Sequence, residues 1–309
     1  MIKETLYEMK SPTRDDFKIQ GYWFGEGEKT LAIVGAMRGD EIQQQYICAR
    51  MVERLKHIEE TDGICHGKRI LVIPSCNPFS MNVGNRFWTM DGTDINRMFP
   101  GYDQGETTQR IAAALFTQLQ EFKYGIQLAS FYMPGDFIPH VRILSTGYED
   151  LESGKLFGMP YVTTRKPRPY DTTLLNYNWQ VWGVKAYSLY AGQTHHVAHT
   201  TSEQSIEAIL RFMQKTGIIS YRSTRAGYES EVFDEEELIN ISAHKAGIFD
   251  ANKTAGEHVK AGEMLARILD PYDCGVKEEV KAPADGTVFF VHNRPLALEH
   301  TLIYRLRGD

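Results

Sequence analysis

Short apolar runs alternate with amphipathic segments over about the first 220 of the 309 residues in this chain. Residues 31–34 and 70–74 are apolar runs bounded by turn residues, which is typical of buried strands. Between them, residues 42–60 place Ile47, Met51 and Leu55 at four-residue spacing, which indicates an amphipathic helix. Further helices are predicted over 107–122 and 202–214, and a strand end over 187–189. The alternation predicts an α/β domain.

The pattern changes after about residue 225, where short β-like runs separated by Gly and Pro follow a polar link. The segment 243–249 is similar to 282–288, and an apolar strand follows each copy, at 264–269 and 302–306. Two copies of one β unit predict a small barrel or sandwich with a pseudo-twofold axis. This tail resembles the biotinyl/lipoyl-type barrel-sandwich domain, but the segment 271–275, which matches the carrier hairpin, contains no lysine. We therefore predict two domains, 1–225 and 226–309, the second a rigid appendage that carries no covalent cofactor.

Composition and charge narrow the classes of partner. The chain is 42% hydrophobic and 24% charged, as is ordinary for a soluble globular protein. Its formal net charge of -6 gives no reason to expect nucleic acid or an anionic membrane as partner. No apolar run approaches the roughly 20 residues that span a bilayer, and the first residues lack the pattern of a secretion signal. The four cysteines are scattered, so we expect a cytoplasmic protein without a disulfide framework. Exposed edge strands in the tail favour a homo-oligomer.

The run G-A-M-R-G-D-E at 35–41 follows the first apolar strand and opens the first helix. With histidine in place of Arg38 it would read H-x-x-E, a two-ligand metal signature at a strand end. A guanidinium has no lone pair to give to a metal, so Arg38 cannot coordinate zinc. The function of the chain therefore depends on this position.

A second cluster of polar residues follows the strand at 70–74. Arg86 and the string D-I-N-R at 94–97 precede F-P-G at 99–101. Because a guanidinium fork matches a carboxylate bidentately, Arg86, Asn96 and Arg97 suit a carboxylate clamp. In the alternative interpretation the two arginines pair on the surface with Asp91, Asp94 or Asp103.

Taken in order, the strand–G-x-x-R-G-D-E run, N-P-F at 77–79 and R…D-I-N-R-x-F-P-G resemble the succinylglutamate desuccinylase/aspartoacylase branch of the zinc carboxypeptidase family. The likeness covers essentially the whole chain, including the tail. It implies a zinc-carboxypeptidase-like α/β fold with a mixed, twisted sheet flanked by helices, followed by the barrel-sandwich domain. It also implies hydrolysis of the amide bond of a small N-acyl amino acid by one zinc ion, with a Glu as general base.

The resemblance places Arg86, Asn96 and Arg97 where the family anchors substrate carboxylates. His140, in the string I-P-H-V-R at 138–142, falls in a segment that the family places near the active cleft. A packing role for His140 is the alternative.

The positions that carry the family's chemistry are mostly substituted. The resemblance puts Glu41 on the carboxylate ligand of the metal, and Arg38 and Ala129 on the two histidine ligands. It puts Tyr190 on the general base. One ligand cannot hold zinc tightly, and a tyrosine with a pKa near 10 is a poor base at neutral pH. We therefore expect no cofactor, and predict a protein that binds a small anionic, N-acyl amino acid-like ligand, with Arg38 placing positive charge where the metal would be.

The alternative is an active amide hydrolase with a rearranged site. The segment 193–199 contains the histidine cluster of the chain, in which His195, His196 and His199 have spacings of three and four residues. In this alternative, members of the cluster hold zinc together with Glu41, or Arg38 polarises a carbonyl without any metal. Solvated histidines in a loop are the ordinary explanation for such a cluster.

Overall fold

The computed structural model describes residues 1–131, 133–194, 196–221 and 226–309. They form two compact units. The first consists of Met1–Ser130 and Pro139–Val232, and the second of Phe131–Ile138 and Phe233–Asp309. The second unit thus begins seven residues after the predicted boundary at 225/226, and it also takes in a short segment from the middle of the chain.

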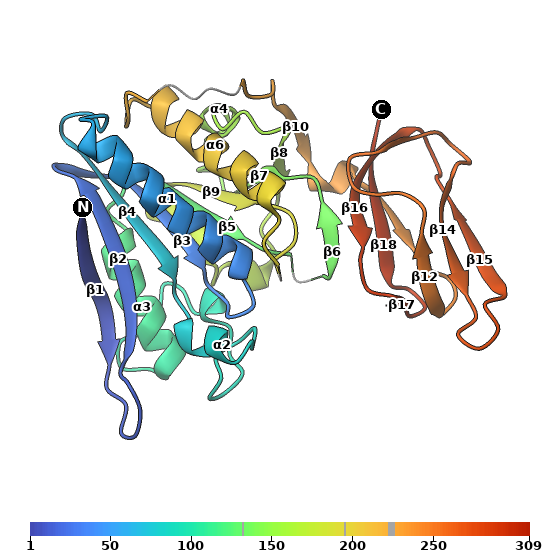
Figure 1. Ribbon diagram of the computed structural model, residues 1–309, viewed down its shortest axis with the longest axis horizontal. Helices are drawn as coiled ribbons and strands as arrows, with labels where there is room; N and C mark the ends of the chain where they lie inside the picture. Colours follow the sequence, from blue (N-terminus) through green and yellow to red (C-terminus); the bar gives the residue numbers. More distant parts are fainter. Residues whose placement is uncertain (132, 195, 222–225) are drawn as a thin grey trace. The chain divides into compact units, whose positions relative to one another are not determined.

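The first unit is built on a mixed sheet of nine strands in the order β1-β2-β4-β3-β5-β9-β7-β8-β10 (Figure 1). Strands β4, β3, β5 and β9 run parallel to one another, whereas β2 is antiparallel to β4, and β7 to β9. The fold class is therefore the predicted mixed α/β arrangement. The strand bounds are β1 Ile2–Met9, β2 Phe17–Gly25, β3 Glu28–Ala36, β4 Lys68–Ser75, β5 Tyr124–Ala129, β7 His140–Leu144, β8 Tyr161–Arg165, β9 Lys185–Tyr190 and β10 Glu231–Asp234.

Helices cover both faces of this sheet, because successive side chains of a strand point to opposite faces. In β3, Leu31 and Ile33 belong to the core cluster with α1 and α6, which lie side by side in Figure 1. Ala32 and Val34 belong to the cluster with α3 and α5. The helices are α1 Ile42–Glu60, α2 Pro78–Asn82, α3 Thr107–Leu119, α4 Leu151–Lys155, α5 Leu175–Val181 and α6 His199–Lys215, with 3-10 turns η1 Ile95–Arg97 and η2 Pro169–Asp171. A third 3-10 turn, η3 Glu235–Glu237, belongs to the second unit.

The second unit is a sandwich of two antiparallel sheets around one apolar core. One sheet has the order β11-β18-β16-β13, with β6 also paired to β16, and the other has the order β15-β14-β12-β17. The bounds are β6 Gly135–Phe137, β11 Ile239–Ser242, β12 Gly247–Ala251, β13 His258–Val259, β14 Met264–Leu269, β15 Val276–Lys281, β16 Gly286–His292, β17 Leu296–Ala297 and β18 Leu302–Gly308.

The two sheets reflect the internal repeat in the sequence. Strands β11–β14 form one copy and β15–β18 the other, and each copy contributes two strands to each sheet. Equivalent hydrogen bonds recur. The Ala243 N–H donates to the carbonyl of Thr301 at 2.9 Å, and the Ala282 N–H donates to the carbonyl of Glu263 at 2.9 Å. The two copies are therefore interlocked rather than stacked as separate units.

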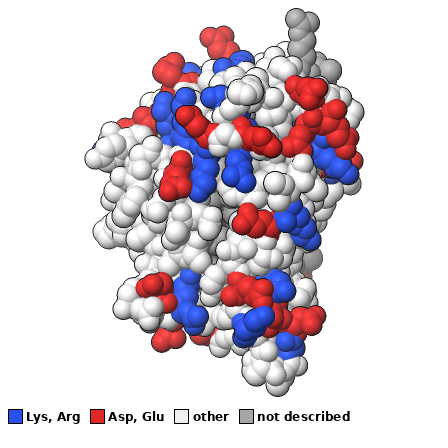
Figure 2. All heavy atoms as spheres, turned by 90° about the vertical axis from the view of Figure 1, so that its left-hand side faces the viewer, with Lys and Arg blue, Asp and Glu red and all other residues white. Residues whose placement is uncertain are grey.

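Charged side chains of both signs are mixed on the face drawn in Figure 2. Within the β1–β2 hairpin, Lys10 pairs with Glu8 and Asp16. Within the described ranges, none of the helices has the length and apolar character needed to cross a bilayer.

Candidate functional site

The candidate site lies at the carboxyl edge of the parallel strands. Ala36, Ala129 and Tyr190 end β3, β5 and β9, and Ala129 is paired in register with Tyr190. Because parallel strands end at the same edge of a sheet, the residues that follow them are brought together from distant parts of the chain. Arg38 and Glu41 follow β3, and Glu41 immediately precedes α1.

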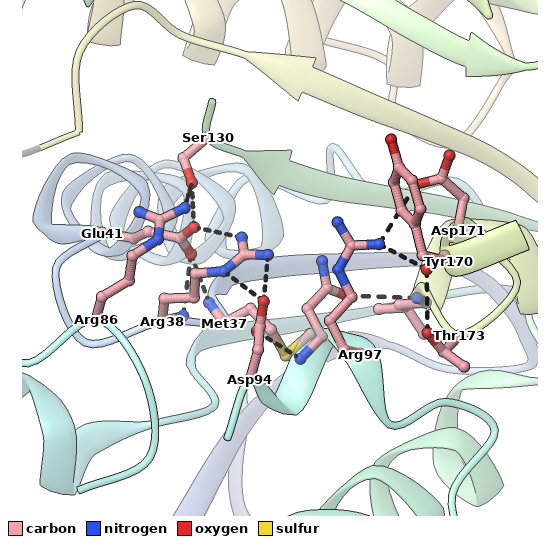
Figure 3. A network of polar contacts seen from close by, with 12 residues as sticks. Met37, Arg38, Glu41, Arg86, Asp94, Arg97, Ser130, Tyr170, Asp171 and Thr173 are labelled. Atoms are coloured by element: carbon pink, nitrogen blue, oxygen red, sulfur yellow. Dashed lines mark hydrogen bonds and ion pairs between the residues drawn. The ribbon is translucent and has the colours of Figure 1, made fainter. Parts of the chain in front are cut away.

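Glu41 is 1% exposed, and both of its carboxylate oxygens are engaged. Oε2 accepts the backbone N–H groups of Met37 at 2.9 Å and Arg38 at 3.1 Å. Oε1 accepts Nη1 of Arg38 at 3.0 Å and the hydroxyl of Ser130 (Figure 3). Four donors therefore converge on this buried carboxylate.

Arg38 lies between Glu41 and Asp94. Its Nε and Nη2 donate to Oδ2 of Asp94 at 3.1 and 2.8 Å, while Nη1 donates to Glu41. Burial lowers the pKa of the guanidinium, but the charges of Glu41 and Asp94 outweigh burial and raise the pKa above its ordinary value. Arg38 is thus a permanent cation held by two carboxylates.

Arg86 lies beside this group and also touches Ser130. Its Nη1 donates to Oδ2 of Asp40 at 2.9 Å, and its Nη2 donates to Oγ of Ser130 at 3.4 Å. The acidic partner of Arg86 is therefore Asp40, rather than one of the three aspartates considered from the sequence. Ser130 links Arg86 to Glu41.

Asn96 and Arg97 lie in η1, which Asp94 caps by accepting the Asn96 N–H on Oδ1 at 3.0 Å. Asp94 therefore joins this turn to Arg38. The Oδ1 atom of Asn96 accepts the Leu175 N–H at 3.4 Å. The Nδ2 group of Asn96 has no hydrogen-bond acceptor among the residues that the structure describes.

Arg97 is held by one of its terminal nitrogens. Nη1 donates to the carbonyl of Tyr170 at 2.7 Å and lies 3.4 Å from Oδ1 of Asp171. Asp171 is 1% exposed and also pairs with Arg165 at 2.9 Å. The Nε and Nη2 edge of Arg97 meets no hydrogen-bond acceptor in the described part of the chain, and the side chain is 37% exposed. A cationic fork is therefore partly open to ligand.

Tyr190, the last residue of β9, contacts two side chains of β7. Its ring stacks on that of His140, with centroids 4.8 Å apart and planes within 5°. Arg142 donates from Nη1 to the Tyr190 hydroxyl, and its Cζ lies 4.3 Å from the ring centroid. His140 is fully buried beneath this ring contact.

The histidine cluster is described only in part, because His195 lies outside the described residues. His196 and His199 are exposed, and His199 is the first residue of α6. Nδ1 of His199 lies 3.5 Å from the Tyr46 hydroxyl. Over the described residues, no group of three or more His, Cys, Asp or Glu side chains is arranged to hold a metal ion.

Several residues of the site were not singled out by the sequence: Asp40, Ser130, Arg142, Arg165 and Asp171. Ser130 follows directly on the string 127–129 that matches the second metal ligand, and Asp40 lies inside the run 35–41. Their places beside or within these motifs could have identified Ser130 and Asp40 as site residues. Asp171 had no such signal, because only the tertiary structure brings it to Arg97.

Comparisons with known proteins agree with the fold. The family model for the succinylglutamate desuccinylase/aspartoacylase catalytic domain matches residues 27–215, which is more than half of the chain. The N-alpha-acetyl-L-2,4-diaminobutyric acid deacetylase of Halomonas elongata is 23% identical over 287 residues, or 85% of this chain and 77% of the relative.

Solved structures match both units. The product-bound ectoine utilization protein EutE (DoeB) from Ruegeria pomeroyi has a TM-score of 0.81 at 18% identity, covering 100% of this chain and 95% of that one. A succinylglutamate desuccinylase from a Silicibacter species has a TM-score of 0.80 at 17% identity, covering 98% and 92%. At these identities the likeness concerns the fold.

Proposed function

Because this chain belongs to the succinylglutamate desuccinylase/aspartoacylase family, we propose that it binds a small, carboxylate-bearing, N-acyl amino acid-like ligand and that the family's zinc-hydrolase site is lost. The family match and the name of the Halomonas deacetylase support an N-acyl amino acid deacylase-like function in the broad sense. The loss of the zinc site and the carboxylate clamp are the specific parts of the proposal.

The observation that carries the proposal is the position of Arg38 between Glu41 and Asp94. Zinc takes lone pairs from neutral imidazole, thiolate or carboxylate, and catalytic sites supply three protein ligands. Here Glu41 already accepts four hydrogen bonds, and Ala129 has no donor atom. The donor set does not fit a zinc ion.

Arg38 supplies positive charge without coordination chemistry. A guanidinium carries five N–H groups, and three of those of Arg38 make hydrogen bonds to protein. The other two have no acceptor among the described residues, so they can donate to a carbonyl or carboxylate oxygen. A guanidinium does not make hydroxide from water at neutral pH, which is the task of the metal in the family's hydrolases.

Of the three residues expected in the carboxylate clamp, Arg97 and Asn96 have donors open to a ligand, whereas Arg86 donates to Asp40 and Ser130. The open Nε and Nη2 edge of Arg97 matches a carboxylate bidentately, and Nδ2 of Asn96 offers a further donor. Arg97 and Arg165 share the single carboxylate of Asp171, so this group has one positive charge in excess. A ligand carboxylate would neutralise that charge.

The alternative, a hydrolase with a rearranged metal site, has less support from the geometry. His196, just before α6, and His199, its first residue, are both exposed. Both carboxylate oxygens of Glu41 already accept hydrogen bonds from protein groups. No described contact joins Glu41 to either histidine.

Metal analysis tests the loss of the zinc site. The protein should be purified without added metal and its zinc content measured by mass spectrometry. We expect far less than one zinc per chain. The matched comparison is the triple variant Arg38→His, Ala129→His, Tyr190→Glu, in which the family's ligands and base are restored and zinc should bind. A full equivalent of tightly held zinc in the unaltered protein would refute the proposal.

Calorimetry with N-acetyl-L-glutamate and N-acetyl-L-aspartate tests ligand binding. We expect measurable binding that survives a chelator, because the clamp contains no metal. Binding that appears only after zinc is added would favour the alternative hydrolase.

A further inference from the structure

Ser130 combines a nucleophilic hydroxyl with an adjacent carboxylate. It follows the last residue of β5 and is half-buried, whereas Glu41 is fully enclosed. The Ser130 hydroxyl donates its hydrogen bond to Oε1 of Glu41. Because Oε2 accepts two backbone N–H groups, Oε1 is the oxygen that faces the hydroxyl proton. A nucleophile in hydrogen-bond contact with a base is the first requirement for covalent catalysis.

Two guanidinium groups flank this pair. Nη2 of Arg86 lies 3.4 Å from Oγ of Ser130, and Nη1 of Arg38 lies 3.0 Å from the same Oε1 that Ser130 contacts. Positive donors next to a nucleophile stabilise the negative charge that develops on a carbonyl oxygen during attack. The arrangement thus contains a nucleophile, a base and a source of oxyanion stabilisation within one cluster (Figure 3).

We propose that Ser130 is an acyl-accepting nucleophile with Glu41 as its base, in a metal-free acyl transfer. Oγ attacks the acyl carbonyl carbon while its proton passes to Oε1 of Glu41. When the C–N or C–O bond to the leaving group breaks, that proton passes from Glu41 to the departing amine or alcohol. Water then attacks the Ser130 ester, Glu41 accepts a proton from the water and returns it to Oγ, and the carboxylic acid is released.

This inference goes beyond ligand binding and rests on the proposed function only for natural ligands, which the Arg97 clamp would hold by their carboxylate. An activated ester without a carboxylate does not need the clamp. The two ideas can therefore be tested separately on the same protein.

The test is acylation of the full chain by 4-nitrophenyl acetate with a chelator present. Intact-mass and peptide mass spectrometry should find one acetyl group on Ser130. It should be absent from Ser130→Ala and retained in the control Ser220→Ala, which alters a surface serine. Glu41→Gln should slow acetylation of the peptide containing Ser130 roughly 100-fold, as expected when a general base is removed. Should Glu41→Gln fold poorly, Ser130→Cys replaces it, and acetylation should move to the introduced thiol.

Acetyl groups found only on lysines or other surface residues would overturn the proposal, as would a Ser130 acetylation rate unchanged in Glu41→Gln. If Ser130 stays unmodified while N-acetyl-L-glutamate still binds in an Arg97-dependent manner, the acyl transfer is refuted and the binding function stands. If Ser130 is acetylated but no N-acyl amino acid binds, the acyl transfer is supported and the binding function is refuted.

Discussion

Arg38 and Asp94 are 56 positions apart, and two nitrogens of Arg38 donate to a single oxygen of Asp94 at 3.1 and 2.8 Å. The contact joins the turn after β3 to the turn that carries Arg97. The side chains are 11% and 13% exposed, so the pair is largely removed from water. The charge at the centre of the site and the orientation of the clamp therefore depend on the same contact.

Replacing Arg38 by Met should destabilise the protein. The change leaves Glu41 and Asp94 as buried carboxylates without their cation, which costs about 3–5 kcal/mol in comparable cases. Urea unfolding followed by circular dichroism measures the loss. The control is Arg54→Met, because Arg54 is 38% exposed and its pairing with Glu203 at 3.6 Å should contribute less than about 1 kcal/mol. Equal effects of the two substitutions would argue against a buried Arg38 cluster.

Replacing Arg97 by Ala should weaken binding of N-acyl amino acids. Loss of hydrogen bonds to a charged group costs about 1.5–3 kcal/mol, or roughly a 10- to 100-fold fall in affinity by calorimetry. Arg97→Lys keeps the charge but not the fork and should recover only part of the affinity. Lys166→Ala is the control, because Lys166 is an exposed cation on the same segment. Unchanged affinity in Arg97→Ala would show that the ligand binds elsewhere.

Replacing Gly101 by Ala tests why the string around the clamp ends in glycine. Gly101 has φ +91°, and a Cβ there would lie 2.1 Å from the backbone nitrogen of Ala113 in α3. We expect a loss of roughly 3 kcal/mol or more from backbone strain and overpacking together. Gly84→Ala is the matched control, because Gly84 has φ +65° with nothing within 4 Å of its added Cβ. It should cost about 1 kcal/mol from strain alone. Similar losses at both positions would exclude crowding against α3.

Mildly acidic pH should destabilise the second unit through His292. Burial lowers the pKa of His292, which is 6% exposed and packs edge-on against Phe249. The unfolded chain therefore binds a proton near pH 6.5 while the folded chain still excludes it. The contribution to stability is complete above about pH 6.5 and falls as pH drops toward the lowered folded pKa. Unfolding of wild type and His292→Gln at several pH values measures it, and the variant should show a weaker pH dependence.

Local patterns predicted the regular elements of the first unit well. The helix over 42–60 has the predicted bounds. Ile47, Met51 and Leu55, whose spacing predicted it, all face the core. The helix over 107–122 ends earlier, at Leu119, and the last helix begins earlier than predicted, at His199. In these segments spacing alone determines which face is buried.

The contacts of the site could not be predicted in the same way. Ser130 reaches Glu41 because β3 and β5, which are distant in sequence, end at one edge of the sheet. Asp171 follows β8, which runs opposite to β9, and it meets Arg97 through the turn η2. The pairing of β6 with β16 joins Asp136 to Val291 and was also missed. A three-residue strand has no periodicity to detect, and its partner lies far along the chain. The sequence motifs at 35–41 and 94–101 identified the region of the site. The ion pairs within that region could be identified only from the three-dimensional structure.

In the second unit, each sheet contains strands from both repeats, and this determines what happens when the chain is cut between them. A nick in the hairpin at 270–275, between β14 and β15, would leave every pairing between the repeats in place. Discarding either fragment would instead remove two strands from each sheet and expose the shared apolar interior. A single repeat expressed alone should therefore fail to fold, while two separate repeats mixed together should assemble.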